Sequence, residues 1–121
     1  MNVGIIGLGY WGPILFRNFR AHPDVRTITL CDHHEEKTAR LVAGQSDVRV
    51  VKTSDELMAD PTIDLVVVAT PAKQHFALSK QALERGKHVL VEKPFVCSLK
   101  EGEALLELAR RHDRILMVDH P

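Results

Sequence analysis

The sequence has few cysteines and no excess of charge of either sign. Its two cysteines, Cys31 and Cys97, form no CxxC pair and no spacing typical of metal ligands, so we expect two buried free thiols rather than a disulfide or a zinc site. Sixteen basic residues balance sixteen acidic ones. Proteins that bind nucleic acid or anionic membranes carry a basic excess on one face, so we expect neither partner.

Long hydrophobic runs are also missing. A helix needs about 20 apolar residues to cross a bilayer, and no segment approaches that length. The first apolar stretch, residues 3–6, is too short for the core of a signal peptide. The composition, 45% hydrophobic and 26% charged over 121 residues, is typical of one globular domain, and we expect a cytoplasmic protein.

Short apolar runs alternate with helical patterns along the chain. Strands are expected at residues 3–6, 27–31, 48–51, 65–69, 88–92 and 115–118, and helical patterns open near residues 11, 35, 53, 76 and 98. Two of these helix starts carry a capping box, Thr53 with Glu56 and Ser98 with Glu101. Connections this short indicate parallel strands with helices on both faces.

The sequence therefore predicts an α/β fold, a doubly wound parallel sheet of the Rossmann type with the strand order 3-2-1-4-5-6. This order places the third strand, which contains Arg49, at an edge of the sheet. The fourth strand is the most apolar, so we expect it to be central.

A glycine motif follows the first strand and opens the first helix. Gly7 suits a tight turn, Gly9 allows a diphosphate to approach the main chain, and Gly12 lets the helix lie close to the strand. Free backbone amides and the helix dipole would then bind the anion. Tyr10 and Trp11 between the glycines are candidate cofactor contacts, with core packing as the alternative. A glycine-rich turn that binds nothing is the alternative for the motif.

Asp32 stands at the end of the second strand, 20 residues after Gly12. A carboxylate at this place accepts hydrogen bonds from both hydroxyls of an adenosine ribose and repels a 2′-phosphate, so we expect NAD in preference to NADP. A helix N-cap is the alternative role for Asp32. His33 and His34 bear on the choice of cofactor, because a protonated imidazole attracts a phosphate. Adjacent residues rarely ligate one ion, so we expect no metal site here.

Two further motifs lie at the ends of the fourth and fifth strands. They are Ala69-Thr70-Pro71 followed by His75, and the run GKHVLVEKP at residues 86–94. Together with the glycine motif they closely resemble the Gfo/Idh/MocA oxidoreductases, the glucose-fructose oxidoreductase and inositol dehydrogenase family, over essentially all 121 residues. Residues 9–13, 17–19 and 116–120 are similar to members that act on nucleotide-linked sugars, such as UDP-N-acetylglucosaminuronate 3-dehydrogenases.

The resemblance implies roles for individual residues. Thr70 and Pro71 would line the cofactor trough beside the nicotinamide half, and His75 would open the next helix near that trough. Glu92 and Lys93 would bind the cofactor at the end of the fifth strand. Lys93 is the expected catalytic residue, because its ammonium group would hold an alkoxide-like oxygen as hydride leaves. A solvated strand-end ion pair is the alternative role for Glu92 and Lys93.

The resemblance also implies a division of labour between domains. We expect residues 1–121 to form one dinucleotide-binding domain, with the family's C-terminal substrate domain absent. By family, the protein would be a dehydrogenase that transfers hydride between NAD and a hydroxyl of a sugar or nucleotide-sugar, and a homo-oligomer in full-length form. We expect the isolated chain to be inactive, because the family's proton-transfer residues lie in the second domain.

Two other functions compete with the dehydrogenase. One is a non-catalytic module that binds or senses a nucleotide. The other is a methyltransferase-like nucleoside binder, since such folds also combine a glycine-rich loop with an acid after the second strand. The Thr70-Pro71 turn and the Glu92-Lys93-Pro94 sequence count against the methyltransferase.

Overall fold

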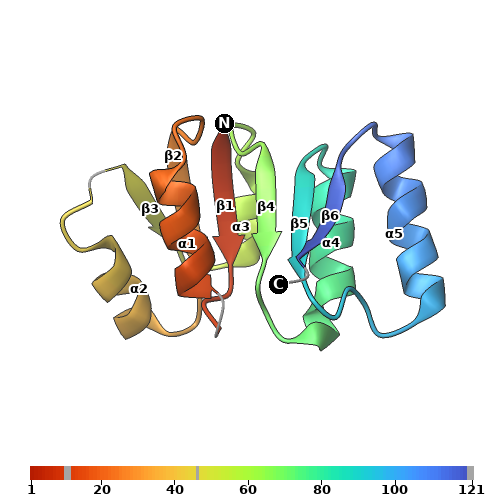
Figure 1. The fold of residues 1–121 in the computed structure, drawn as a ribbon, viewed down its shortest axis with the longest axis horizontal. Coiled ribbons are helices and arrows are strands. Elements are labelled where there is room, and N and C mark those ends of the chain that lie inside the picture. The colour runs from red at the N-terminus through yellow and green to blue at the C-terminus, as the bar shows by residue number, and fades with distance from the viewer. Residues whose placement is uncertain (10–11, 46, 120–121) are drawn as a thin grey trace.

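The computed structural model describes residues 1–9, 12–45 and 47–119, in which strands and helices alternate (Figure 1). The strands are β1 (Asn2–Ile6), β2 (Thr27–Cys31), β3 (Val48–Val51), β4 (Leu65–Val68), β5 (His88–Glu92) and β6 (Leu116–Asp119). The helices are α1 (Gly12–Ala21), α2 (Glu35–Val42), α3 (Ser54–Ala59), the 3-10 turn η1 (Ala72–Gln74), α4 (His75–Glu84) and α5 (Leu99–Arg111).

All six strands belong to one parallel sheet in the order β3-β2-β1-β4-β5-β6. The predicted fold class and strand order are therefore confirmed, with β3 at an edge and β4 in the interior. The order reverses between β1 and β4, where Ile6 pairs with Cys31 on one side and with Val68 on the other. In doubly wound sheets, ligands bind beyond the carboxyl ends of the strands at this reversal.

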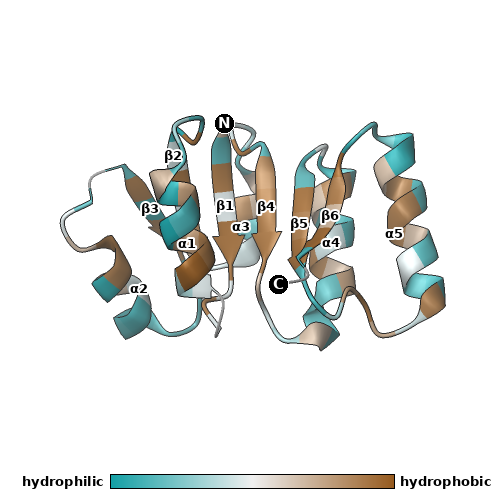
Figure 2. Cartoon of the chain, viewed as in Figure 1, coloured by the Kyte–Doolittle hydropathy of each residue, from teal (hydrophilic) through white to brown (hydrophobic). Residues whose placement is uncertain are grey.

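Two hydrophobic cores cover the two faces of the sheet. Helices α1 and α2 pack on one face around Phe16 and Ile5, whereas α3, α4 and α5 pack on the other around Leu57, Leu83 and Leu105. Figure 2 shows that hydrophobic residues concentrate in the strands and that hydrophilic residues occupy much of the helix surfaces. Burial on both faces explains why these strands are nearly continuous apolar runs.

The ends of several helices follow the predicted signals. The Thr53 hydroxyl accepts a hydrogen bond from the Glu56 amide at 3.1 Å, and the Ser98 hydroxyl accepts one from the Glu101 amide at 3.2 Å, so the N-cap bond of each predicted capping box is confirmed. The Glu101 carboxylate accepts from the Cys97 amide and not from the Ser98 amide that a capping box would use. The segment after β4 differs slightly from the prediction. A 3-10 turn follows Pro71, and α4 begins at His75.

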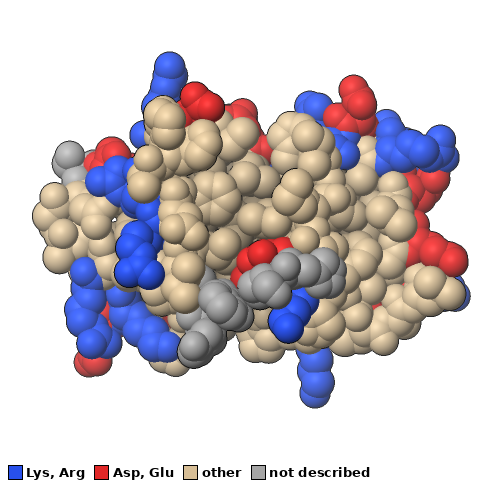
Figure 3. All heavy atoms as spheres, viewed as in Figure 1, with Lys and Arg blue, Asp and Glu red and all other residues tan. Residues whose placement is uncertain are grey.

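Some surface features also depart from the predictions or extend them. Cys31 is buried, but Cys97 is exposed, so the prediction of two buried thiols is wrong for Cys97, which lies in the loop between β5 and α5. On the β6 side, Ile115 is 64% exposed and Met117 is 58% exposed. Basic and acidic side chains both occur around the edge of the face shown in Figure 3. Within residues 1–9, 12–45 and 47–119, no helix combines the length and the apolar character needed to cross a membrane.

Candidate functional site

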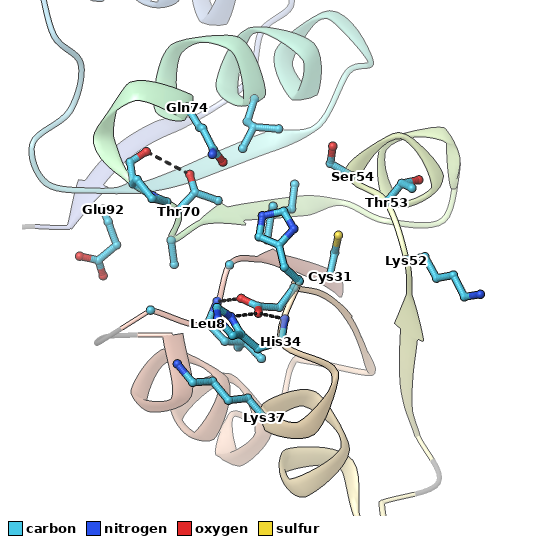
Figure 4. Close-up of a pocket in the computed structure, with 18 of the residues that line it drawn as sticks. Leu8, Cys31, His34, Lys37, Lys52, Thr53, Ser54, Thr70, Gln74 and Glu92 are labelled. Carbon is cyan, nitrogen blue, oxygen red and sulfur yellow. Dashed lines mark hydrogen bonds and ion pairs between the residues drawn. The ribbon is translucent and has the colours of Figure 1, made fainter.

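A cleft of about 850 Å³ opens at the carboxyl ends of β1, β2, β4 and β5. Its volume lies within the range of about 300–1,000 Å³ typical of ligand pockets. Seven of the predicted site residues line it: Gly7, Gly9, Asp32, Thr70, Pro71, Glu92 and Lys93. Figure 4 shows Thr70 and Glu92 on one side and Lys52, Thr53 and Ser54 on the other, with Leu8 and His34 between them. The predicted contacts Tyr10 and Trp11 lie outside the described residues.

The glycine motif forms the turn from β1 to α1, and two of its glycines have close backbone neighbours. Gly7 has a φ of +91°, and a Cβ atom there would lie 2.7 Å from the carbonyl oxygen of Ala69. At Gly12 a Cβ atom would lie 2.9 Å from the carbonyl oxygen of Gly7. Gly9 is different, because it is exposed and, among the described residues, its Cβ atom would meet only the Ala69 oxygen, at 3.5 Å. A side chain at Gly9 would therefore project into the cleft rather than into the protein.

Most described amides of this turn already have acceptors. The Gly7 amide donates to the Cys31 carbonyl at 2.8 Å, and the Gly12 amide donates to the Gly9 carbonyl at 3.2 Å. The Leu8 amide donates to Oδ2 of Asp32 at 2.5 Å. The expectation that the loop amides are free is therefore wrong for these three. The Gly9 amide has no acceptor among the described residues. This amide and the start of α1 are therefore the groups that can bind an anion.

The Asp32 carboxylate is held in place through both of its oxygens. Oδ2 accepts from the Leu8 amide, and Oδ1 accepts from the His34 amide at 2.6 Å and lies 2.9 Å from the His34 ring nitrogen Nδ1. The Asp32 side chain is only 7% exposed, yet the residue lines the cleft. A carboxylate oxygen has two acceptor sites, and Oδ1 already faces two donors, so Oδ2 retains one site for a ligand hydroxyl.

These hydrogen bonds also keep Asp32 ionised. Burial acts to raise the pKa of Asp32, but the hydrogen bonds from the His34 and Leu8 amides and from the His34 ring outweigh it and hold the pKa below its ordinary value. The N-cap residue of α2 is His34, whose side chain makes no capping hydrogen bond. Asp32 therefore does not occupy the N-cap position; its carboxylate accepts a hydrogen bond from the His34 amide, in the turn before the helix. Burial raises the pKa of the neighbouring Cys31 thiol, and the charge of Asp32 adds to this effect.

Glu92 is a buried acid at the end of β5. It is 6% exposed, and its oxygen Oε1 has no hydrogen-bond partner among the described residues. Burial, together with the hydrogen bond and the negative charge of Asp119, raises the pKa of Glu92 to about 7. Asp119 is the register partner of Glu92 on β6. The adjacent Lys93 is exposed, and the peptide bond between it and Pro94 is cis.

His75 is brought to the site without lining it. The residue is 1% exposed and begins α4. Its ring nitrogen Nδ1 lies 2.8 Å from the carbonyl oxygen of Pro94, and Nε2 lies 2.8 Å from that of Thr70. Among the described residues, His75 therefore contacts two turns that border the cleft rather than the cleft itself.

Three charged residues near the site were not predicted from the sequence. Lys37 and Lys52 line the cleft, and Asp119 borders it through Glu92. All three lie at or just beyond the carboxyl ends of strands or in the first turn of the following helix, which is the signal that would have found them. In the described part of the chain, no group of three or more histidine, cysteine or acidic residues is placed to hold a metal ion.

The residues present fit a dinucleotide. The exposed main chain at Gly9 leaves space for a diphosphate, and the fixed Asp32 carboxylate borders the same cleft. The unpartnered Oε1 of Glu92 lies in the cleft wall near the end of β5, where a hydroxyl or amide of a ligand would satisfy it. The cleft therefore offers an anion site, a diol site and a further polar site along the carboxyl ends of the strands.

Comparison with known proteins identifies relatives over nearly the whole chain. The uncharacterized oxidoreductase YdgJ of Escherichia coli (strain K12) is 37% identical over 120 residues, which are 99% of this chain and 34% of the relative. The UDP-N-acetylglucosamine 3-dehydrogenase of Acidithiobacillus ferrooxidans is 31% identical over 99% of this chain and 37% of its own length. The chain thus spans about a third of the length of these relatives.

Solved structures with the same fold include complexes with both nicotinamide cofactors. Biliverdin reductase from Synechocystis sp. PCC 6803, in complex with biliverdin and NADP⁺, matches with a TM-score of 0.91 and 34% identity over 98% of this chain and 37% of that one. GenD2 from gentamicin A biosynthesis, in complex with NAD, matches with a TM-score of 0.90 and 33% identity over 98% of this chain and 34% of that one.

A family profile agrees with these individual matches. The profile describes an oxidoreductase family with an NAD-binding Rossmann fold, and it matches residues 1–120. The cleft at the sheet reversal, the glycine turn and the acid at the end of β2 are the features expected of such a domain. This chain belongs to the Gfo/Idh/MocA oxidoreductase family and is an NAD(P)-binding domain of it.

Proposed function

We propose that this domain holds NAD for hydride transfer to or from a hydroxyl group of a sugar or nucleotide-sugar. The observation that carries the proposal is the Asp32 carboxylate, fixed through both oxygens at the edge of the cleft and kept ionised there. The sugar assignment is supported by the relative named UDP-N-acetylglucosamine 3-dehydrogenase and by another named scyllo-inositol 2-dehydrogenase (NADP(+)).

The proposed binding mode runs along the carboxyl ends of the strands. The diphosphate lies against the Gly9 main chain and the start of α1, where an amide and the positive end of the helix face it. The adenosine ribose donates a hydroxyl hydrogen to Oδ2 of Asp32, which keeps one acceptor site. The nicotinamide half lies between the turn that contains Thr70 and Pro71 and the end of β5 that contains Lys93.

NAD is proposed over NADP because of the charge on Asp32. Its low pKa keeps the carboxylate negative at neutral pH, and a negative group beside the ribose repels a 2′-phosphate. Lys37 and Lys52 line the same cleft, and their positive charges attract a 2′-phosphate instead of repelling it. We therefore expect a preference for NAD and not an exclusion of NADP. Asp32→Asn removes the charge and retains an acceptor oxygen, and we expect it to narrow the difference in affinity between the two cofactors.

Lys93 is the proposed catalytic residue of the assembled enzyme. The bound nicotinamide supplies the hydride acceptor or donor. The Lys93 ammonium group would donate to the substrate oxygen, orient it and stabilise the negative charge that develops there. Since the chain spans about a third of the length of its relatives, we propose that residues outside it complete the substrate site and that residues 1–121 alone turn nothing over.

The exposed Ile115 and Met117 on the β6 side are a proposed surface for self-association.

Fluorescence titration of the purified chain with NADH and NADPH tests this function. We expect saturable binding of both, with NADH the tighter, and no production of NADH from NAD⁺ and UDP-N-acetylglucosamine. Tighter binding of NADPH would contradict the role of Asp32. Preferential binding of S-adenosylmethionine over NADH would contradict the dehydrogenase assignment altogether, and steady turnover would show that the chain already contains its proton-transfer group.

A further inference from the structure

One buried imidazole joins the two turns that form a wall of the cleft. His75 is 1% exposed, and its ring lies 2.8 Å from the Thr70 carbonyl through Nε2 and 2.8 Å from the Pro94 carbonyl through Nδ1. The Thr70 turn follows β4, and the Pro94 turn follows β5 (Figure 1). A single side chain on α4 therefore contacts the main chain of both segments.

This link lies where the sheet no longer holds the two segments together. The register of β4 and β5 ends with Val68 opposite Val91. The chain beyond Val68 leaves the sheet at Thr70 and Pro71, and the chain beyond Val91 leads to Lys93; all three of these residues line the cleft. Without the ladder, the separation of the two turns depends on side chains that span them.

The chemistry of the contacts makes the imidazole suited to this task. Carbonyl oxygens only accept hydrogen bonds, so each contact is a hydrogen bond when the facing ring nitrogen carries a proton. The ring is rigid and carries a nitrogen on each of two sides, so it contacts both carbonyl oxygens at once. A neutral ring donates to one of them, and a protonated ring donates to both. Burial removes competing water, which strengthens whichever bonds form.

We propose that His75 is a positioning residue that fixes Thr70 and Lys93 relative to each other, and thereby shapes the nicotinamide half of the site without touching the cofactor. The inference rests on the proposed function, because it takes these two residues to border the nicotinamide. It distinguishes His75 from Gly9 and Asp32, which serve the diphosphate and the adenosine half. A change at His75 should therefore affect the two halves of the cofactor unequally.

Two amide variants separate the two contacts of His75. In His75→Asn the side-chain amide lies near the place of Nδ1 and retains a donor toward the Pro94 carbonyl, whereas in His75→Gln it extends toward the place of Nε2 and the Thr70 carbonyl. Ser79→Ala is the matched control. Ser79 lies one turn later on the same helix and is fully buried, and its hydroxyl has no hydrogen-bond partner among the described residues.

The test compares the affinities of the purified chain for ADP and for NADH. We expect both His75 variants to bind ADP within about twofold of the unaltered chain and to bind NADH about tenfold more weakly, because each variant loses one of the two contacts that hold the turns. Ser79→Ala should leave both affinities unchanged. An equal loss for ADP and NADH, or no loss for either ligand, would overturn the proposal. If the unaltered chain binds neither ligand, the proposed function itself fails and the inference falls with it.

A measurement on the unaltered protein covers the case in which the variants do not fold. In nitrogen-15 NMR spectra of the histidine side chains, NADH should shift the His75 ring signals, because the nicotinamide half contacts both of the turns that the ring contacts. ADP should leave these signals in place. Equal shifts with ADP, or no shift with NADH, would overturn the proposal.

Discussion

Gly7 combines a backbone conformation that favours glycine with a wall of main-chain atoms. Its φ is +91°, and a Cβ atom would lie 2.7 Å from the Ala69 oxygen, 2.8 Å from the Ala69 carbonyl carbon and 2.9 Å from the Thr70 nitrogen. The neighbours are backbone atoms of the chain that follows β4, so they cannot move aside as a flexible side chain would. Gly7→Ala therefore forces the β1 and β4 ends apart at the centre of the cleft.

The loss of stability in Gly7→Ala has two parts, and other glycines of the chain allow the two parts to be measured separately. A left-handed conformation costs a non-glycine residue about 1–2 kcal/mol, and overpacking adds about 1–3 kcal/mol. Gly44 and Gly86 have φ values of +75° and +76°, and a Cβ atom at either place meets no atom of the described residues within 4 Å. We therefore expect Gly44→Ala and Gly86→Ala to cost about 1 kcal/mol each and Gly7→Ala about 3 kcal/mol or more.

Urea unfolding followed by circular dichroism measures these differences. The unfolding free energy of each alanine variant is obtained by linear extrapolation, and the slope shows whether the folded state keeps its compactness. Equal losses at Gly7, Gly44 and Gly86 would contradict this prediction, because they would show that the contact with Ala69 and Thr70 adds nothing to the dihedral cost.

Three further predictions concern acids and the lysine of the site. Because the pKa of Glu92 is raised from 4.5 to about 7, the folded protein keeps a proton that the unfolded chain releases, so its unfolding free energy should fall as pH rises through this window, by up to about 3 kcal/mol. Glu92→Gln should flatten that decline in urea titrations at several pH values, and an unchanged slope would contradict the assigned pKa. Asp32→Ala leaves the Leu8 and His34 amides without their acceptor, so we expect the unfolding free energy to fall by about 2 kcal/mol. We also expect this variant to lose NADH binding in fluorescence titrations, and full NADH affinity would contradict the role of Asp32. In a longer protein that carries this domain, Lys93→Ala should lower kcat about hundredfold or more with little change in NAD affinity, and equal losses in steady-state kinetics and binding would assign Lys93 a binding role.

The sequence carried the information for the fold because periodicity and local signals specify it. Apolar runs bounded by turns marked the six strands, and the arginine in β3 correctly indicated an edge. The caps at Thr53 and Ser98 are local interactions over three residues, so they too were predictable. The glycine turn and Asp32 could be placed at the same cleft because parallel strands end at one edge of the sheet.

Other features depend on contacts between distant residues and left no periodic signal. The hydrogen bond from the Leu8 amide to Asp32 joins residues 24 positions apart. The Glu92–Asp119 pair depends on the register of β5 with β6. The family resemblance placed His75 near the cofactor, but its burial between two carbonyl groups becomes visible only in the folded chain. The exposure of Cys97 likewise depends on the path of a loop, which composition does not specify.

The exposed main chain at Gly9 is the proposed binding place of the cofactor diphosphate. Gly9→Ala adds one methyl group whose one contact within 4 Å in the described part of the chain is the Ala69 oxygen, at 3.5 Å, so the stability of the fold should change by no more than about 0.5 kcal/mol. The same methyl group would stand where the diphosphate approaches. Titration of this variant with NADH, beside its urea unfolding curve, is the most direct test. We predict at least a tenfold loss of NADH affinity, about 1.4 kcal/mol, with an unchanged unfolding midpoint. Unchanged NADH affinity in a normally folded variant would contradict the account.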